Sequence, residues 1–250
     1  MKTISFILPA YNEENAIKHT VTSIAEYCDA KQYPYEIIII DDGSTDGTYR
    51  LAGEITGKNA SVKALRHTSN RGKGAAVRTG MAAAQGDILL FLDADGSTNV
   101  SELDSFFPYL KENYDVVIGS RYLPESTIGK KQPHLRVVIG RIGNLLIQLL
   151  LLPGVADTQC GCKVFSRKAA QQIFSRQTID GWGFDMEILA IARLQGLQVK
   201  EVPISWFDAT NRASRFRPMK DMLRTLAELC SIKTNMLFGR YTVDERKFFF

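Results

Sequence analysis

The chain has 250 residues, and its 45% hydrophobic and 23% charged content is that of a globular protein, which excludes a disordered or fibrous chain. With 31 basic and 27 acidic residues the formal net charge is only +4, so we expect no nucleic-acid partner. The longest uncharged apolar stretch, residues 142–156, is interrupted by polar residues and a proline and is shorter than the roughly 18 residues of a membrane-spanning helix.

Short apolar runs alternate with helical patterns along the first half of the chain. Strands are predicted at residues 4–8, 36–40, 62–65, 88–92 and 116–119, and helices at 15–27, 48–56, 75–84 and 101–113. The runs at 37–40 and 88–92 are apolar on both faces, which is typical of central parallel strands covered by helices. The alternation therefore predicts a doubly wound, mainly parallel α/β sheet whose ligands bind beyond the carboxyl ends of the strands.

The second half is less regular. Strands are predicted at 164–165 and 199–205, and helices at 184–194 and 219–238. Residues 126–156 and 209–220 carry several basic residues and no acid, and the latter stretch includes Arg212 and Arg215. The Leu-rich residues 145–152 indicate either a helix lying in a membrane interface or a helix of the core.

The four cysteines and the N-terminus indicate the cellular location of the protein. Cys28, Cys160, Cys162 and Cys230 are too few and scattered for a disulfide scaffold, and Cys160 and Cys162 are expected to be small buried residues. Residue 1 leads directly into a predicted strand with no signal-peptide pattern. These features predict a cytoplasmic location.

Polar clusters follow the predicted strands of the first half. The sharpest contains Asp93 and Asp95, one residue apart after a fully apolar strand. Two such carboxylates suit Mg²⁺ or Mn²⁺ with phosphate oxygens completing the shell, although a simple turn has the same residues. At residues 70–74, which include Lys73, glycines precede a helix as in a phosphate loop, but neither the P-loop ATPase nor the dinucleotide-dehydrogenase pattern is matched.

Other side chains have both a binding and a structural interpretation. Tyr11 offers a ring for a nucleobase, while Glu13 suits either a ribose hydroxyl or the dipole of the following helix. Asp42 suits a ribose or base edge, or only a turn. Trp182 and Trp206 suit either a sugar face or the core. The three histidines, His19, His67 and His134, are expected at the surface.

Taken in order, these motifs resemble the inverting glycosyltransferases of family 2, which have the GT-A fold. The matching segments of the first half are Pro-Ala-Tyr-Asn-Glu-Glu at 9–14, Asp-Asp-Gly-Ser-Thr-Asp-Gly-Thr at 41–48, Asn-Arg-Gly-Lys-Gly at 70–74 and Asp-Ala-Asp-Gly at 93–96. Gly-Ser-Arg-Tyr at 119–122, Asp-Thr-Gln-Cys-Gly at 157–161 and Glu-Val-Pro-Ile at 201–204 resemble the branch that makes polyprenyl-phosphate sugars, the dolichyl-phosphate glucosyltransferases and mannose synthases. The Gln-x-x-Arg-Trp motif of processive synthases is absent from the sequence.

The resemblance implies a role for each matching position. It places the nucleoside against Pro9, Ala10, Tyr11, Glu13 and Asp42, while Lys73 is expected to bind the donor because of the phosphate-loop pattern at 70–74. It implies a metal bound by Asp95, with Asp93 as a sugar contact or second ligand. Arg121 would contact the donor diphosphate or the acceptor phosphate, and Asp185 would bind sugar or act as a base. The acceptor side would include Gln159, Arg212 and Arg215.

The resemblance also implies an activity. The enzyme would be metal-dependent, with Mg²⁺ or Mn²⁺, and would move glucose or mannose from UDP-glucose or GDP-mannose to a polyprenyl phosphate. It would act as a peripheral protein at the cytoplasmic face of a membrane, and a homo-oligomer is left open. The implied catalytic domain is residues 1–217, with a nucleotide-sugar half at 1–122 and an acceptor half at 123–217, followed by a helix and tail at 218–250 that face a membrane or a partner.

Three alternatives remain at this point. A soluble family 2 transferase would act on a hydroxyl of a glycan or lipid-linked sugar and would need Asp185 or Glu187 as its base. A nucleotide-sugar-binding module would have lost catalysis, which the intact Asp93 and Asp95 argue against. A nucleotidyltransferase would have a Gly-rich basic loop after the first strand, which residues 9–14 do not form.

Overall fold

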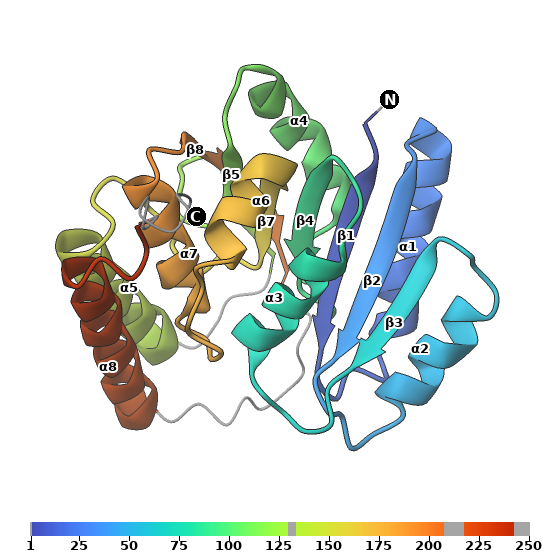
Figure 1. Ribbon diagram of the computed structural model, residues 1–250, viewed down its shortest axis with the longest axis horizontal. Helices are drawn as coiled ribbons and strands as arrows, with labels where there is room; N and C mark the ends of the chain where they lie inside the picture. The colour runs from blue at the N-terminus through green and yellow to red at the C-terminus, as the bar shows by residue number, and fades with distance from the viewer. Residues whose placement is uncertain (1, 130–133, 208–217, 243–250) are drawn as a thin grey trace, which may run out of the picture.

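The computed structural model describes residues 2–129, 134–207 and 218–242, and within them the chain folds around a seven-stranded sheet (Figure 1). The strand order is β3-β2-β1-β4-β7-β5-β8. Neighbouring strands run parallel except for β7, which is antiparallel to both β4 and β5. The predicted doubly wound, mainly parallel sheet is confirmed.

Every element predicted in the first half is present. The strands are β1 (Ile4–Ala10), β2 (Tyr35–Asp41), β3 (Val62–Arg66), β4 (Ile88–Leu92) and β5 (Val116–Ser120). The helices are α1 (Ile17–Lys31), α2 (Thr48–Thr56), α3 (Lys73–Ala83) and α4 (Leu103–Lys111), the last preceded by a 3₁₀ turn, η1 (Val100–Glu102). Bounds differ from the prediction by a few residues, as expected where apolar spacing is the signal.

The second half departs further from the prediction. The strand predicted at 164–165 is β7 (Cys162–Ser166), and the strand predicted at 199–205 divides into β8 (Val199–Pro203) and β9 (Ser205–Trp206). β9 pairs with β6 (Thr127–Ile128) in a separate two-stranded sheet. The remaining helices are α5 (His134–Leu150), α6 (Arg167–Phe174), α7 (Phe184–Leu194) and α8 (Pro218–Leu237), and of these α6 was not predicted.

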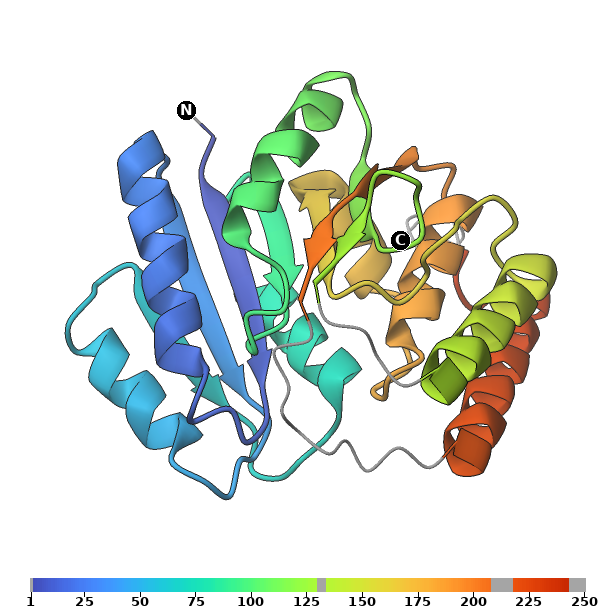
Figure 2. The ribbon, with the colours of Figure 1, turned by 180° about the vertical axis from the view of Figure 1, so that it is seen from behind.

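The core lies in two layers, one on each face of the sheet. In β2, Ile38 and Ile40 pack on the layer of α3, α6 and α7, while Ile37 and Ile39 pack on the layer of α1, α2 and α4. Figures 1 and 2 show these two sets of helices on opposite faces. Because successive side chains of a strand point to opposite faces, a run of four isoleucines supplies both layers at once.

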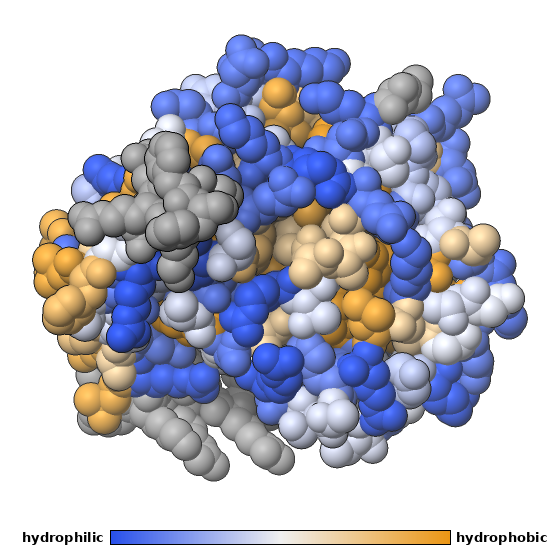
Figure 3. Space-filling view, viewed as in Figure 1, coloured by the Kyte–Doolittle hydropathy of each residue, from blue (hydrophilic) through white to orange (hydrophobic). Residues whose placement is uncertain are grey.

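Helices α5 and α8 lie side by side at the end of the molecule away from α2 (Figures 1 and 2). Ile147 of α5 and Ile232 of α8 are buried in the core, whereas Ile142, Leu145 and Leu149 of α5 are 52%, 53% and 71% exposed. The interpretation of the Leu-rich stretch as a core helix is therefore right for one side of α5, while a place for its exposed apolar side in a membrane interface stays a prediction. Figure 3 shows apolar residues gathered along this edge.

No helix in the described ranges, 2–129, 134–207 and 218–242, has the length and apolar character needed to cross a membrane.

Candidate active site

Most of the predicted site residues that the structure describes lie in loops at one edge of the sheet. The carboxyl ends of β1, β2, β4 and β5 carry the clusters that begin at Pro9, Asp41, Asp93 and Arg121. Because β7 is antiparallel, it begins at this edge, so the preceding loop at 156–161 enters beside β4 and β5. The convergence of these segments is the arrangement that the parallel sheet predicts.

Asp93 and Lys73 form an ion pair at the centre of this edge. The Lys73 Nζ is 2.5 Å from the Asp93 Oδ1, and the lysine side chain is only 12% exposed. Burial alone would lower the pKa of Lys73, but Asp93 and Asp185 raise it above its usual value, so the side chain is a cation. Gly161 lies against the Asp93 carboxylate, and a Cβ there would come within 2.0 Å of Oδ2.

Asp93 and Asp95 stay the predicted ligands of a divalent cation. Burial raises the pKa of Asp95, and the negative charge of Asp93 raises it further, although Ser97 and Lys73 act to lower it. The two carboxylates therefore repel each other, and a divalent cation bound by both would reduce that repulsion. Among the residues that the structure describes, no cluster of three or more His, Cys, Asp or Glu could hold a metal. A cation here would therefore need phosphate oxygens or water as further ligands, as Mg²⁺ usually does.

Asp42 holds the loop after β3 in place. Its Oδ1 accepts hydrogen bonds from His67 Nδ1 at 2.6 Å and the Arg71 backbone N–H at 3.0 Å, and its Oδ2 accepts one from the Gly72 N–H at 2.8 Å. His67 is only 8% exposed, so the expectation of a surface position for this residue is wrong. The Asp42 carboxylate positions the phosphate-loop segment, and its contact with a nucleoside stays a prediction.

The loops after β1 and β2 are tied to each other. The Asn12 side-chain oxygen accepts a hydrogen bond from the Thr45 N–H at 2.9 Å, and the Glu13 N–H donates to Thr48 Oγ1 at 2.7 Å. Tyr11 is 43% exposed at this edge, where its ring is available for stacking. Pro9 and Ala10 are the last residues of β1 and directly precede Tyr11 in the chain.

Arg121 fixes the loop at 156–161 through Asp157. The guanidinium donates to both carboxylate oxygens, from Nε at 2.7 Å and from Nη2 at 2.9 Å. Burial would raise the pKa of Asp157, but hydrogen bonds and charge from Arg121 hold it below its usual value. From β8, Glu201 accepts hydrogen bonds from the backbone N–H groups of Ala156 and Asp157. The loop is thereby anchored at two points, and Gln159 on it is exposed.

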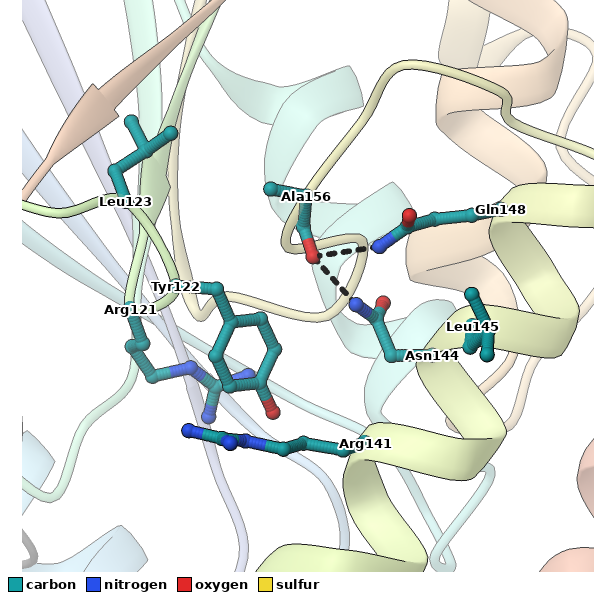
Figure 4. Close-up of a pocket in the computed structure, with 8 residues that line it drawn as sticks. All are labelled: Arg121, Tyr122, Leu123, Arg141, Asn144, Leu145, Gln148 and Ala156. Atoms are coloured by element: carbon teal, nitrogen blue, oxygen red, sulfur yellow. Dashed lines mark hydrogen bonds between the residues drawn. The ribbon is translucent and has the colours of Figure 1, made fainter.

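A pocket of about 490 Å³ opens between this loop, the end of β5 and α5 (Figure 4). Its lining residues are Arg121, Tyr122, Leu123, Arg141, Asn144, Leu145, Gln148 and Ala156. Figure 4 shows Arg141 reaching from α5 toward Arg121 and Tyr122. Two guanidinium groups facing one pocket suit an anion with several oxygens, such as a phosphate.

Asp185 and Glu187 are both buried at the start of α7. Lys163, itself 0% exposed, places its Nζ 2.5 Å from Asp185 Oδ1. Burial raises the pKa of Asp185 despite Lys163 and Lys73. Glu187 is 0% exposed and accepts hydrogen bonds from Thr178 and Tyr241 among others, so it is unsuited to act as a base on a substrate.

Sequence reasoning missed several residues that shape this edge. Lys163 is the charged residue within the apolar strand Cys162–Ser166, and that lone charge was the signal for a buried ion pair. Asp157 and Glu201 belong to the motifs at 157–161 and 201–204, but their roles, like that of His67, depend on contacts between distant segments that no local pattern reveals. Arg212 and Arg215 lie outside the described residues, as does the tail from residue 243.

Comparisons with known proteins agree with the motifs. The family model for glycosyl transferase family 2 matches residues 5–174. A dolichyl-phosphate beta-glucosyltransferase of Dictyostelium discoideum is 32% identical over 96% of this chain and 76% of its own length, and one of Trichomonas vaginalis is 31% identical over 98% and 77%. The human dolichyl-phosphate beta-glucosyltransferase is 29% identical over 98% of this chain and 79% of its own.

A solved structure shares the fold. Glucosyl-3-phosphoglycerate synthase from Mycobacterium tuberculosis, in complex with phosphoglyceric acid, aligns with a TM-score of 0.66 and 25% identity over 92% of this chain and 80% of that one. The same synthase with Mn²⁺, UDP-glucose and phosphoglyceric acid aligns with a TM-score of 0.67 at 24% identity, over 92% of this chain and 79% of that one.

Proposed function

The chain belongs to glycosyl transferase family 2 and has the GT-A fold, and from this membership we propose that it moves glucose from UDP-glucose to the phosphate of a polyprenyl phosphate such as dolichyl phosphate. Support comes from relatives with that name that match nearly the whole chain. UDP-glucose is preferred over GDP-mannose because these relatives are glucosyltransferases. The observation that carries the acceptor assignment is the pocket between Arg121 and Arg141 beside the apolar side of α5.

The donor would lie across the edge formed by β1, β2 and β4. Tyr11 offers a ring for the uracil, and the loop held by Asp42 brings the N-terminus of α3 to the diphosphate. A divalent cation held by Asp93 and Asp95 would stabilise the negative charge that develops on the leaving UDP. Lys73, which is cationic beside Asp93, would neutralise part of the same charge.

The acceptor phosphate would lie between Arg121 and Arg141. Arg121 is held by its two hydrogen bonds to Asp157, so its position is fixed before the acceptor arrives. A phosphate is already largely ionised at pH 7 and can attack the anomeric carbon without a base. The burial of Glu187 and the pairing of Asp185 with Lys163 support such an acceptor over a hydroxyl, which would need a base.

The lipid chain would leave the pocket along α5. Leu145 lines the pocket and is 53% exposed, and Leu149, one turn further on, is 71% exposed. An exposed apolar side next to basic residues suits the interface of a membrane with anionic lipids. We therefore assign the enzyme to a membrane surface as a peripheral protein, on the cytoplasmic face.

The test is transfer of labelled glucose. Purified protein with Mn²⁺ and labelled UDP-glucose is added to liposomes that contain polyprenyl phosphate, and we expect label in the lipid extract. GDP-mannose should label it far less. Label found only in water-soluble acceptors would contradict the proposal.

A charge variant tests the pocket. Arg141→Gln should raise the KM for polyprenyl phosphate about tenfold while the Kd for UDP-glucose is unchanged. Lys111→Gln removes an exposed charge at the end of α4, outside the pocket, and is the matched control. Equal KM values in the two variants would contradict the acceptor assignment.

A further inference from the structure

The segment before α7 lies on the phosphate-loop segment, although more than 100 residues separate them in sequence. The Ala75 N–H donates to the Asp180 carbonyl at 3.2 Å, and Gln177 Nε2 donates to the Gly74 carbonyl at 3.0 Å. A Cβ on Gly72 would come within 2.4 Å of the Asp180 carbonyl oxygen, so the two backbones are in direct contact. Residues 177–184 therefore form one wall of the donor edge.

Trp182 projects from this wall into solvent beside the donor edge. Its side chain is 62% exposed, which is unusual for the residue type that buries most apolar surface. The Lys73 ammonium, which pairs with Asp93, lies 5.3 Å from the centre of the indole ring. The Lys73 ammonium is therefore close to both the Trp182 ring and the Asp93 carboxylate, which is expected to contact the donor.

The backbone around Trp182 is held closely by α8. A Cβ on Gly181 would come within 2.3 Å of the Arg224 guanidinium, and one on Gly183 within 2.5 Å of the Glu228 carboxylate. Arg224 and Glu228 also pair with each other at 3.2 Å. An exposed indole on an anchored backbone is a ready contact surface that loses little conformational freedom when a ligand binds.

We propose that Trp182 forms the wall of the subsite for the hexose of the donor, with its ring against the C–H face of the sugar. The assignment rests on the proposed function, since it requires a nucleotide sugar at the edge formed by Asp93 and Lys73. A pyranose has an apolar face for the indole and hydroxyl groups at its rim for carboxylate and ammonium groups. The residue contributes to sugar binding and takes no part in proton transfer.

The decisive measurement compares UDP-glucose with UDP, which lacks the hexose and has a free terminal phosphate in its place. Titration calorimetry with Mg²⁺ present gives the Kd of UDP and of UDP-glucose. Trp182→Ala should weaken UDP-glucose binding about tenfold and leave UDP binding unchanged, since only the sugar contacts the ring. An equal loss for both ligands, or no loss for either, would overturn the assignment.

A matched control removes another aromatic ring that faces a lysine. Tyr109 of α4 has Lys200 at 4.9 Å from its ring centre, on a helix that contributes nothing to the donor edge. Tyr109→Ala should leave the ratio of the two Kd values at its wild-type value. A ratio that shifts in Tyr109→Ala as much as in Trp182→Ala would overturn the assignment.

A second readout works if Trp182→Ala does not fold. The sequence has two tryptophans, so Trp206→Phe leaves Trp182 as the sole indole. Its fluorescence should change on addition of UDP-glucose and not on addition of UDP, and identical responses would overturn the assignment. A wild-type protein that binds neither ligand would contradict the proposed donor and, with it, this subsite.

Discussion

Glu187 gives the sharpest test of whether a buried acid at this site is structural or catalytic. Its Oε1 accepts hydrogen bonds from the Thr178 N–H at 2.9 Å, the Thr178 hydroxyl at 2.5 Å and the Tyr241 hydroxyl at 2.7 Å. Its Oε2 accepts one from the Ile179 N–H at 2.8 Å. Because the side chain is 0% exposed, water cannot replace these contacts when the carboxylate is removed.

The expected cost follows from the donors left without an acceptor. In Glu187→Gln the amide N–H₂ takes the place of one carboxylate oxygen and must face at least one hydrogen-bond donor. The loss is smallest when it replaces Oε2 and faces only the Ile179 N–H, and leaving that N–H without an acceptor costs about 1–3 kcal/mol. Glu187→Ala removes every contact, and we expect about 3–5 kcal/mol because losses within one network are not additive. Tyr241→Phe removes one donor to Glu187 and also the hydroxyl that accepts a hydrogen bond from Asn235 Nδ2 at 3.0 Å, so it should cost about 1–3 kcal/mol.

Urea denaturation, followed by circular dichroism, measures these free energies of unfolding. Turnover with UDP-glucose and polyprenyl phosphate is measured on the same variants at a temperature where each is folded. We expect Glu187→Gln to lose stability and retain turnover within about tenfold. Wild-type stability with turnover lowered by about 10²-fold or more would instead indicate general base catalysis and refute the structural interpretation.

Three further predictions concern the donor edge and the loop at 156–161. Asp95→Asn should abolish metal-dependent turnover and weaken Mn²⁺ binding at least about tenfold, measured by electron paramagnetic resonance; unchanged turnover with metal present would remove the proposed metal role. Gly161→Ala places a Cβ within 2.0 Å of Asp93 Oδ2, so we expect a large fall in turnover, with circular dichroism confirming that the variant is folded. Arg121→Lys loses the paired hydrogen bonds to Asp157 and should lower the free energy of unfolding by about 2–3 kcal/mol at pH 7. Although burial acts to raise it, the pKa of Asp157 in the folded protein is below the unfolded-state value of about 3.9. The ion pair therefore contributes its full stabilisation above about pH 3.9 and loses it as the pH falls through the folded-state pKa. The difference between wild type and Arg121→Lys should therefore shrink in acid, and a difference that grows there would contradict the ion pair.

Much of the donor edge was predictable because its signals are local. The runs at 37–40 and 88–92 are apolar on both faces, and the acids that follow them, Asp41 and Asp93, end on the same edge as predicted. Cys160 and Cys162 are buried, as expected. These features depend on residues within a few positions of each other, which is the range over which hydrophobic periodicity carries information.

The rest depends on contacts between distant segments. The strand β7 is a short apolar run whose antiparallel place between β4 and β5 is set by packing and leaves no mark in its own sequence. α6 was not predicted, although Ala169, Ala170, Ile173 and Phe174 do have helical spacing, because the run is only eight residues long. His67 and Glu187 are polar residues that are buried because loops far along the chain supply their partners, and a single sequence gives no sign of that.

The antiparallel strand β7 also bears on how the protein folds during synthesis. β1 pairs with β2 and β2 with β3 in chain order, and β4 then pairs with β1, but β4 gains its second neighbour only when residues 162–166 emerge. Pairings between distant residues form slowly because the intervening loop must be closed first. Until then one side of β4 has unpaired N–H and C=O groups, so a ribosome pause before residue 162 would prolong an aggregation-prone intermediate.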